Sequence, residues 1–253
     1  MPRYRVTLEY DGTPYCGYQR QKNGPSVQGA LEQAVHRCTR EQVNIGAAGR
    51  TDTGVHALGQ VAQIDLERPW DEGKLFRAIN ALLKEAGEPV AVLDLAEAEQ
   101  GWDARFSATA RHYRYRILTR VPAPTIDANR VWWVRRGLDV SAMADAAQEL
   151  IGHHDFTTFR STDCQSKSPE KTLDVLDVER HGDEVHVTAS ARSFLHNQVR
   201  SLVGTLKMVG AGRWTRQDVA RALAAKDRKA GGPVAPSCGL YFERVDYGSG
   251  DPT

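Results

Sequence analysis

The sequence predicts an α+β fold of two related halves, in which antiparallel or mixed sheets are flanked by helices. Strand-like and helix-like stretches interleave along the 253 residues without the regular rhythm of a doubly wound parallel fold. A loosely similar order of elements recurs in residues 1–105 and 106–253, which we take as an N-terminal and a C-terminal half. Because pockets favour the junction of two such units, we expect an active-site cleft between the halves.

The N-terminal half opens with a half-buried strand, since residues 3–10 alternate between apolar and polar side chains. A helix is predicted over 26–39, because Ser26 can cap it and apolar residues then recur at helical spacing. A short strand at 43–46, a glycine-rich turn and an apolar strand at 58–66 complete the elements predicted here.

The C-terminal half begins in the same way, with an alternating strand at 111–118 and another strand at 129–134. An amphipathic helix is predicted over 139–152, with a glycine cap at its end. Residues 171–191 indicate two strands joined by a turn at Gly182-Asp183, and 194–212 indicate a long helix.

The composition excludes several classes of protein. Apolar residues make up 41% and charged residues 26%, as in ordinary globular proteins, and no apolar run reaches the roughly eighteen residues of a membrane span. The first residues lead into a strand without a signal-peptide core, which predicts a cytoplasmic protein. The four cysteines are far apart and the histidines lack metal-binding spacing, so we predict no metal and reduced, mostly buried thiols.

The net charge of +1 conceals two basic stretches. Residues 105–137 carry eight arginines against one acid, a net +7, and residues 192–229 carry nine basic residues against two acids, again +7. The acids gather in 61–104, which sums to −6, and in 138–191, which sums to −7. The basic stretches could line one groove that binds a phosphate backbone, or they could be unrelated solvated faces. Charge alone favours neither interpretation.

The most informative segment is AAGRTDTGVHA, residues 47–57, a polar loop between two predicted strands. Gly49 and Gly54 permit backbone conformations that other residues resist, and loops held rigidly by strands often carry active sites. A plain structural turn is the alternative, with Asp52 as the turn former and Arg50 as its ion-pair partner.

The motif GRTD-x-GVHA resembles the active-site loop of the TruA-type pseudouridine synthases. Further segments resemble that family in the same order along nearly the whole chain: EYDGTPYCGYQRQ at 9–21 with SVQGALEQAV after it, RFSATARHYRYRI at 105–117, DFTTFR at 155–160 with Cys164-Gln165-Ser166, FLHNQVRSLVGTLKMVG at 194–210 and GLYFERVDY at 239–247. The sequence departs from the family pattern at Tyr18 (usually Trp), Thr53 (usually Ala or Ser), Lys84 (usually Pro) and Arg192 (usually smaller). None of these changes removes a residue on which the chemistry depends.

The resemblance implies roles for individual residues. Asp52 matches the nucleophile, and Arg200 the cation that pairs with it and keeps it ionised. Arg50 matches the arginine that takes the place of a flipped base. Tyr113 matches the aromatic that stacks on the extruded uracil, with Tyr115 as its competitor on the same strand face. Other implied contacts are Leu240, which closes the pocket, and the RNA-backbone residues Gln19, Arg20, Arg111, Arg114 and Lys207.

The resemblance also implies an isomerase that converts uridine to pseudouridine in the anticodon stem-loop of tRNA, at tRNA positions 38 to 40, and that works as a homodimer. The reaction transfers no electrons or outside groups, so no cofactor is expected, in keeping with the lack of a P-loop or dinucleotide motif.

Two other classes of function stay open at this point. One is a non-catalytic tRNA-binding protein or RNA chaperone derived from such an enzyme. The other is a nucleoside hydrolase, which the single carboxylate of the motif disfavours. The sequence leaves open which tRNAs are preferred, whether Asp52 attacks ribose or base, and whether the tail after Gly248 is ordered.

Overall fold

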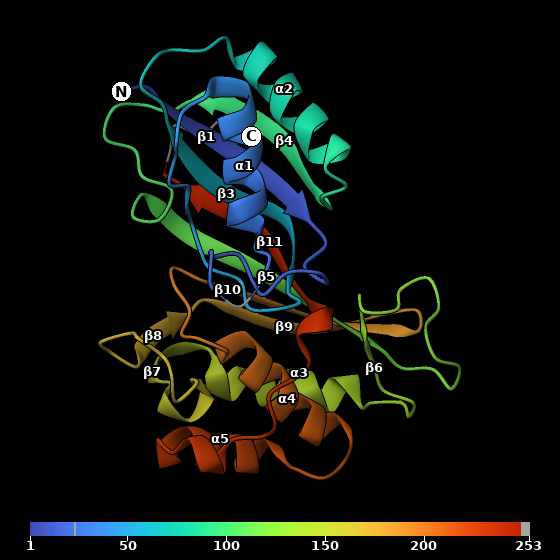
Figure 1. Cartoon of the computed structure of the whole chain (residues 1–253). Helices are drawn as coiled ribbons and strands as arrows, with labels where there is room; N and C mark the ends of the chain where they lie inside the picture. Colours follow the sequence, from blue (N-terminus) through green and yellow to red (C-terminus); the bar gives the residue numbers. More distant parts are fainter. Residues whose placement is uncertain (23, 249–253) are drawn as a thin grey trace. The chain divides into compact units, whose positions relative to one another are not determined.

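A computed structural model of the chain describes residues 1–22 and 24–248, and it confirms the α+β class. The tail after Gly248 lies outside the described residues. The chain divides into two compact units (Figure 1). Unit 1 comprises Met1–Thr109 and the C-terminal segment that begins at Tyr241, and unit 2 comprises Ala110–Leu240.

Unit 1 is built on a mixed sheet with the strand order β4-β1-β3-β11. Its strands are β1 (Arg3–Tyr10), β3 (His56–Asp65), β4 (Val90–Glu97) and β11 (Leu240–Tyr247), and the short β2 (Gly46–Ala47) pairs with β3. β1 is antiparallel to β3 and β4, whereas β11 runs parallel to β3. The alternation predicted for residues 3–10 is confirmed, because every second side chain of β1 is buried.

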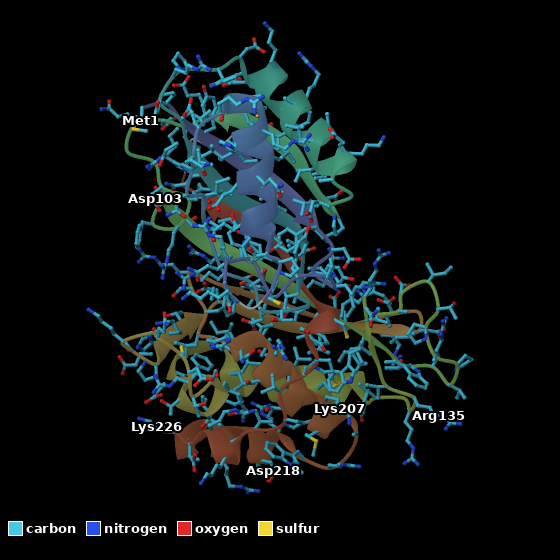
Figure 2. All side chains as sticks on the ribbon, in the orientation of Figure 1. Met1, Asp103, Arg135, Lys207, Asp218 and Lys226 are labelled. Carbon is cyan, nitrogen blue, oxygen red and sulfur yellow. The ribbon has the colours of Figure 1, made fainter. Side chains whose placement is uncertain are left out.

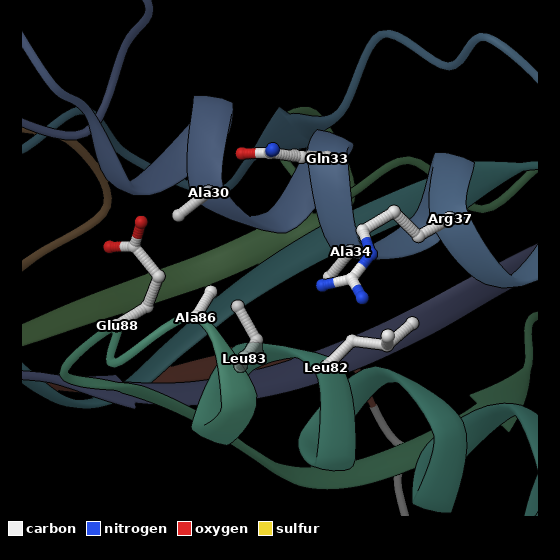
Figure 3. A pocket seen from close by; sticks show the side chains of 8 residues that line it. All are labelled: Ala30, Gln33, Ala34, Arg37, Leu82, Leu83, Ala86 and Glu88. Carbon is white, nitrogen blue, oxygen red and sulfur yellow. The ribbon is translucent and has the colours of Figure 1, made fainter.

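Two helices, α1 (Val27–Thr39) and α2 (Glu72–Glu85), lie side by side against this sheet (Figure 1). The predicted cap of α1 is confirmed, since the Ser26 side chain accepts a hydrogen bond from the backbone N–H of Gly29. A small pocket opens between the helices and is lined by Ala30, Gln33, Ala34, Arg37, Leu82, Leu83, Ala86 and Glu88 (Figure 3). None of the predicted site residues lines it.

Unit 2 contains the antiparallel strands β5 (Ala108–Leu118), β10 (Glu184–Ala191) and β9 (Val175–His181). β6 (Trp132–Trp133) pairs with β5, and β7 (Gly152–Asp155) pairs with β8 (Glu170–Leu173). The helices α3 (Val140–Ala147), α4 (Gln198–Gly210) and α5 (Arg216–Ala225) pack on one another, and α3 also packs on β9. Short 3₁₀ turns occupy Gln148–Leu150, Thr157–Phe159, Arg228–Ala230 and Ser237–Gly239.

Several predicted boundaries are wrong. The strand at 43–46 shrinks to β2 and that at 129–134 to β6. The helix at 139–152 ends at Ala147 and continues as a 3₁₀ turn, so that Gly152 begins β7 instead of capping a helix. The long helix begins at Gln198, because Asn197 adopts a left-handed conformation with φ 62°. The turn at Gly182-Asp183 is confirmed, with φ 60° at Gly182.

All four cysteines are thiols, and each is half-buried. Within residues 1–22 and 24–248, no three His, Cys, Asp or Glu side chains are grouped so that they could hold a metal ion. In the same part of the chain, every helix is too short or too polar to cross a bilayer.

Candidate active site

The loop between β2 and β3 carries Asp52, and hydrogen bonds to β3 hold its first turn. The backbone N–H of Ala48 donates to the carbonyl of Val61 at 2.8 Å, and the Gln60 side-chain amide donates to the carbonyl of Gly49 at 2.7 Å. The loop then closes on itself, because the N–H of Val55 donates to the carbonyl of Asp52 at 3.1 Å. Asp52 is half-buried in this arrangement.

Residues 10–18, which comprise the end of β1 and the segment after it, contact the loop at Thr51, the residue before Asp52. The hydroxyls of Tyr10 and Thr51 share a buried hydrogen bond of 2.8 Å, and the backbone N–H of Tyr18 donates to the carbonyl of Thr51 at 3.0 Å. Gly17 has φ 107°, and a Cβ at this position would lie 2.7 Å from the Thr51 carbonyl oxygen. Thr51 is therefore fixed through both its side chain and its backbone.

A second contact of the same segment supports the far end of the loop. The backbone N–H of Gly12 donates to His56 Nδ1 at 3.1 Å, and a Cβ at Gly12 would lie 1.9 Å from the carbonyl oxygen of Val55. The His56 ring also stacks on Tyr241, with 4.9 Å between ring centroids. The YDG motif at 10–12 and the GVH motif at 54–56 thus pack against each other.

Burial raises the pKa of two tyrosine hydroxyls near the loop. It raises the pKa of Tyr10 to about 12, against the opposing effect of its hydrogen bonds with Thr51 and Gln60. Burial also raises the pKa of Tyr18, which is 2% exposed. Within the described part of the chain, the Tyr18 hydroxyl has no hydrogen-bond partner, whereas that of Tyr10 bonds to Thr51.

In unit 2, the two candidate stacking tyrosines lie on the same face of β5, as their spacing predicts. Tyr115 is completely buried, its hydroxyl donates to the carbonyl of Pro236 at 2.7 Å, and its ring lies against Gly239. Tyr113 remains 9% exposed, and its ring meets the edge of Phe194 with 5.1 Å between centroids. Tyr115 is therefore enclosed in the interior of the unit, and Tyr113 is the more exposed of the two side chains.

Arg200 lies on the first turn of α4, where two acceptors orient its guanidinium. Its Nε donates to the carbonyl of Ala235 and its Nη1 to Asn197 Oδ1, each at 2.8 Å. The side chain is partly buried, as the apolar stripe of this helix predicts. Burial raises the pKa of Tyr115 and of Cys238, and the nearby positive charge of Arg200 opposes both effects.

The other predicted contacts differ in exposure. Arg50 is exposed, whereas Leu240 is 5% exposed, at the point where the last 3₁₀ turn passes into β11. The five predicted RNA-backbone residues are spread over both units. In unit 1, Gln19 is half-buried and Arg20 pairs with Glu32 at 3.1 Å. In unit 2, Arg111 is 8% exposed and donates to the carbonyl of Arg192, and Arg114 is half-buried on the opposite face of β5. The ammonium of Lys207, which Figure 2 labels, lies 5.9 Å from the centre of the Trp132 ring.

The structure thus places Gln19, Arg20, Arg50 and Asp52 in unit 1, and the remaining predicted residues in unit 2. It also identifies supporting residues that sequence reasoning missed. Tyr10 and Gln60 form hydrogen bonds with Thr51 and Gly49 of the loop. The only sign of them in the sequence was their position on alternating strands. Asn197 carried a signal, because an Asn just before a helix is a candidate cap. The predicted helix over 194–212 already included this residue, so it was not considered as a cap.

The fold and this loop define an α+β protein whose candidate site carries the Asp52 carboxylate on a loop with a hydrogen-bonded backbone. The family model described as tRNA pseudouridine synthase matches residues 7–107 and 146–248. The chain belongs to this family, and it is an isomerase.

Relatives named tRNA pseudouridine synthase A are similar over nearly the whole length. Those of Rhizobium meliloti and Agrobacterium fabrum are each 60% identical over 247 residues, covering 98% of this chain and 100% and 93% of theirs. That of Brucella ovis is 57% identical and covers 98% of both chains. A solved structure titled "Crystal Structure of a Cbf5-Nop10-Gar1 Complex" matches with a TM-score of 0.37 at 12% identity, over 94% of this chain and 48% of that one, which adds nothing to the assignment.

Proposed function

We propose that this enzyme isomerises uridine to pseudouridine in the anticodon stem-loop of tRNA, at positions 38 to 40, with Asp52 as the nucleophile. The observation that carries the proposal is the anchoring of the loop: Thr51 is held through its hydroxyl and its carbonyl, so the half-buried carboxylate that follows it starts from a fixed backbone. A backbone fixed in this way lowers the entropic cost of positioning a catalytic group against its target.

In the proposed reaction, the Asp52 carboxylate attacks the ribose or the base, and the bond between N1 and C1′ breaks. The freed uracil turns, C5 bonds to C1′, and the carboxylate leaves. The proton on C5 is lost while N1 gains one, so atoms and electrons balance without a cofactor. A carboxylate suits this chemistry because it stabilises positive charge that develops on the sugar.

Arg200 is proposed to keep the Asp52 carboxylate ionised when the site is closed to water. A buried anion is costly unless a cation and hydrogen bonds compensate it. Partial burial of Arg200 and its two fixed acceptors support this role, because a guanidinium with a set direction is better suited to a carboxylate than a mobile one.

Tyr113 is proposed to stack on the extruded uracil and Leu240 to cover it, while Arg50 fills the space that the base leaves. Extruding a base costs a few kcal/mol, and stacking on an aromatic ring returns roughly 1–3 kcal/mol. The small exposed fraction of Tyr113, 9% against 0% for Tyr115, supports this choice of ring. The exposure of Arg50 is compatible with its role.

Phosphate contacts by Gln19, Arg20, Arg111, Arg114 and Lys207 are proposed to hold the tRNA in register. We further propose that the enzyme is a homodimer in the cytoplasm. Family resemblance alone supports the dimer, and sedimentation equilibrium tests it directly, with the mass of two chains as the expected result.

The reaction is tested with tRNA transcripts that carry tritium at C5 of uracil. Wild-type protein is expected to release tritium into water, and Asp52→Ala to bind the tRNA without release. Binding without release by the wild type would instead indicate an RNA-binding protein, and free uracil would indicate a hydrolase. Transcripts with cytidine at positions 38 to 40 are expected to release no tritium, and undiminished release would place the target elsewhere.

A further inference from the structure

Asn197 occupies an unusual position at the start of α4. A residue that caps a helix normally has extended backbone angles, and its side chain accepts a hydrogen bond from the first turn. Asn197 instead has φ 62° and ψ 7°, and its side chain makes no capping hydrogen bond. Left-handed angles are unfavourable for residues other than Gly, although Asn tolerates them better than most. This conformation and the uncapped helix call for an explanation beyond helix stability.

The Asn197 side chain turns to Arg200 instead. Its Oδ1 accepts from Arg200 Nη1 at 2.8 Å, while the carbonyl of Ala235 accepts from Nε of the same guanidinium at 2.8 Å. The Ala235 acceptor is itself held in place, because its backbone N–H donates to the carbonyl of Arg200 at 3.0 Å. Two edges of the guanidinium are thus tied to two different segments of the chain.

The segment that carries Ala235 has little freedom to move. A Cβ at Gly204 of α4 would lie 1.7 Å from the Pro233 carbonyl oxygen, and one at Gly232 would lie 2.7 Å from Thr205 Cα. The N–H of Gly232 also donates to the Thr205 hydroxyl at 3.0 Å. Because α4 and the segment that carries Ala235 are in such close contact, the Asn197 side chain is the part of the Arg200 surroundings that can adjust.

We propose that Asn197 is a positioning residue that sets the direction of the Arg200 guanidinium for the reaction. This inference rests on the proposed function, in which Arg200 serves the Asp52 carboxylate. The amide is suited to the task because it accepts a hydrogen bond without neutralising the charge that it orients. Aspartate would have the same shape but would compete as a second anion, and glycine would fit the backbone but offer no acceptor.

The test compares two variants that keep the left-handed backbone. Asn197→Gly is expected to melt at or above the wild-type temperature and to lose about 10- to 100-fold in kcat, the loss expected when a reacting group is misplaced by about 1 Å. KM for tRNA should stay within about threefold, because phosphate contacts provide most of the binding. Asn197→Asp is expected to fold and to lose activity to at least the same degree.

Arg40→Gly is the matched control. Arg40 is exposed, ends α1 with φ 67°, and lies outside the proposed site, so the same relief of backbone strain should leave kcat unchanged. A double-mutant cycle with Arg200→Lys separates positioning from general stability. If Asn197 acts only through Arg200, adding Asn197→Gly to Arg200→Lys should lower kcat by less than about a further twofold, since the effects of coupled residues are not additive.

A wild-type kcat in Asn197→Gly would overturn the inference. So would a loss of kcat from Asn197→Gly that is the same with Arg200 present as in the Arg200→Lys background. The outcome for the proposed function is read separately from Asp52→Ala. An inactive Asp52→Ala beside a fully active Asn197→Gly would reject the positioning role alone. An active Asp52→Ala would reject the site on which the inference rests.

Discussion

At the scale of single residues, the structure separates two tyrosines that the sequence could not. Tyr113 and Tyr115 share one strand face, and period-two alternation treats them as equivalent. What distinguishes them is the chain far downstream, because Pro236 and Gly239 enclose the ring and hydroxyl of Tyr115. Such a contact depends on tertiary packing, and no local pattern encodes it.

This difference predicts opposite effects of matched substitutions. Tyr113→Leu is expected to lower kcat/KM by roughly 5- to 150-fold, the equivalent of the 1–3 kcal/mol of a stacked base, and to lower the melting temperature less than Tyr115→Leu does. Tyr115→Leu is expected chiefly to destabilise the protein, because it empties a completely buried site. Thermal melts and tritium release measured on both variants check this, and a strongly destabilised, catalytically normal Tyr113→Leu would reverse the assignment.

At the scale of elements, the most informative contact is that between the segment 10–18 and the Asp52 loop. The sequence showed both motifs but not that they touch. Gly12 and Gly17 are needed there because the opposing backbone leaves no room for a Cβ. Tyr10 supplies the buried hydroxyl that reaches Thr51, and Tyr18 supplies only a backbone N–H.

Removal of the two hydroxyls is therefore expected to have different effects. Tyr10→Phe leaves the buried Thr51 hydroxyl without its partner, so the free energy of unfolding should fall by about 1–3 kcal/mol, and activity should fall with the loosened loop. Tyr18→Phe removes a buried hydroxyl that has no partner among the described residues, so stability should be unchanged or rise by about 1 kcal/mol. Urea unfolding of both variants measures the contrast, and equal losses would contradict it.

At the scale of the whole molecule, the α+β class and many of the helices and strands followed from hydrophobic periodicity, whereas α2, α5, β4 and β11 were not predicted. The wrong boundaries lie where local pattern competes with tertiary contacts. Asn197 leaves the predicted helix to bind Arg200, and the strand around Trp132 is reduced to two paired residues. The identity of the catalytic loop came from its motif, whereas its anchoring by Tyr10 and Gln60 required three-dimensional contacts.

Acid is expected to destabilise the protein through two groups of unit 2. Burial lowers the pKa of His186 below its ordinary 6.5, and the hydrogen bond from Arg116 lowers that of Glu184 below 4.5. Both folded-state values lie below the unfolded ones, so their contributions are complete above those ordinary values and are lost as pH falls. The melting temperature should therefore begin to fall below about pH 6.5 and fall further below about pH 4.5.

The variant His186→Gln tests the first of these steps, and it also removes the hydrogen bond of 2.8 Å between His186 and Glu184 that contributes to the second. It removes the titrating ring, which stacks on His181 and lies near the positive charge of Arg114, and so should flatten the decline between about pH 6.5 and 5. A wild-type melting temperature that rises on acidification through this range would contradict the sign of the effect.

The central claim is that the Asp52 carboxylate performs the chemistry, and single-turnover kinetics of Asp52→Asn test it most directly. Asparagine keeps the size and shape of the side chain, but it replaces one acceptor oxygen with an NH2 donor, carries no charge and is not a nucleophile. With enzyme in excess over tRNA, the rate of pseudouridine formation is expected to fall by at least about a thousandfold, while tRNA affinity stays within about threefold. Formation of pseudouridine by this variant at near the wild-type rate would contradict the account.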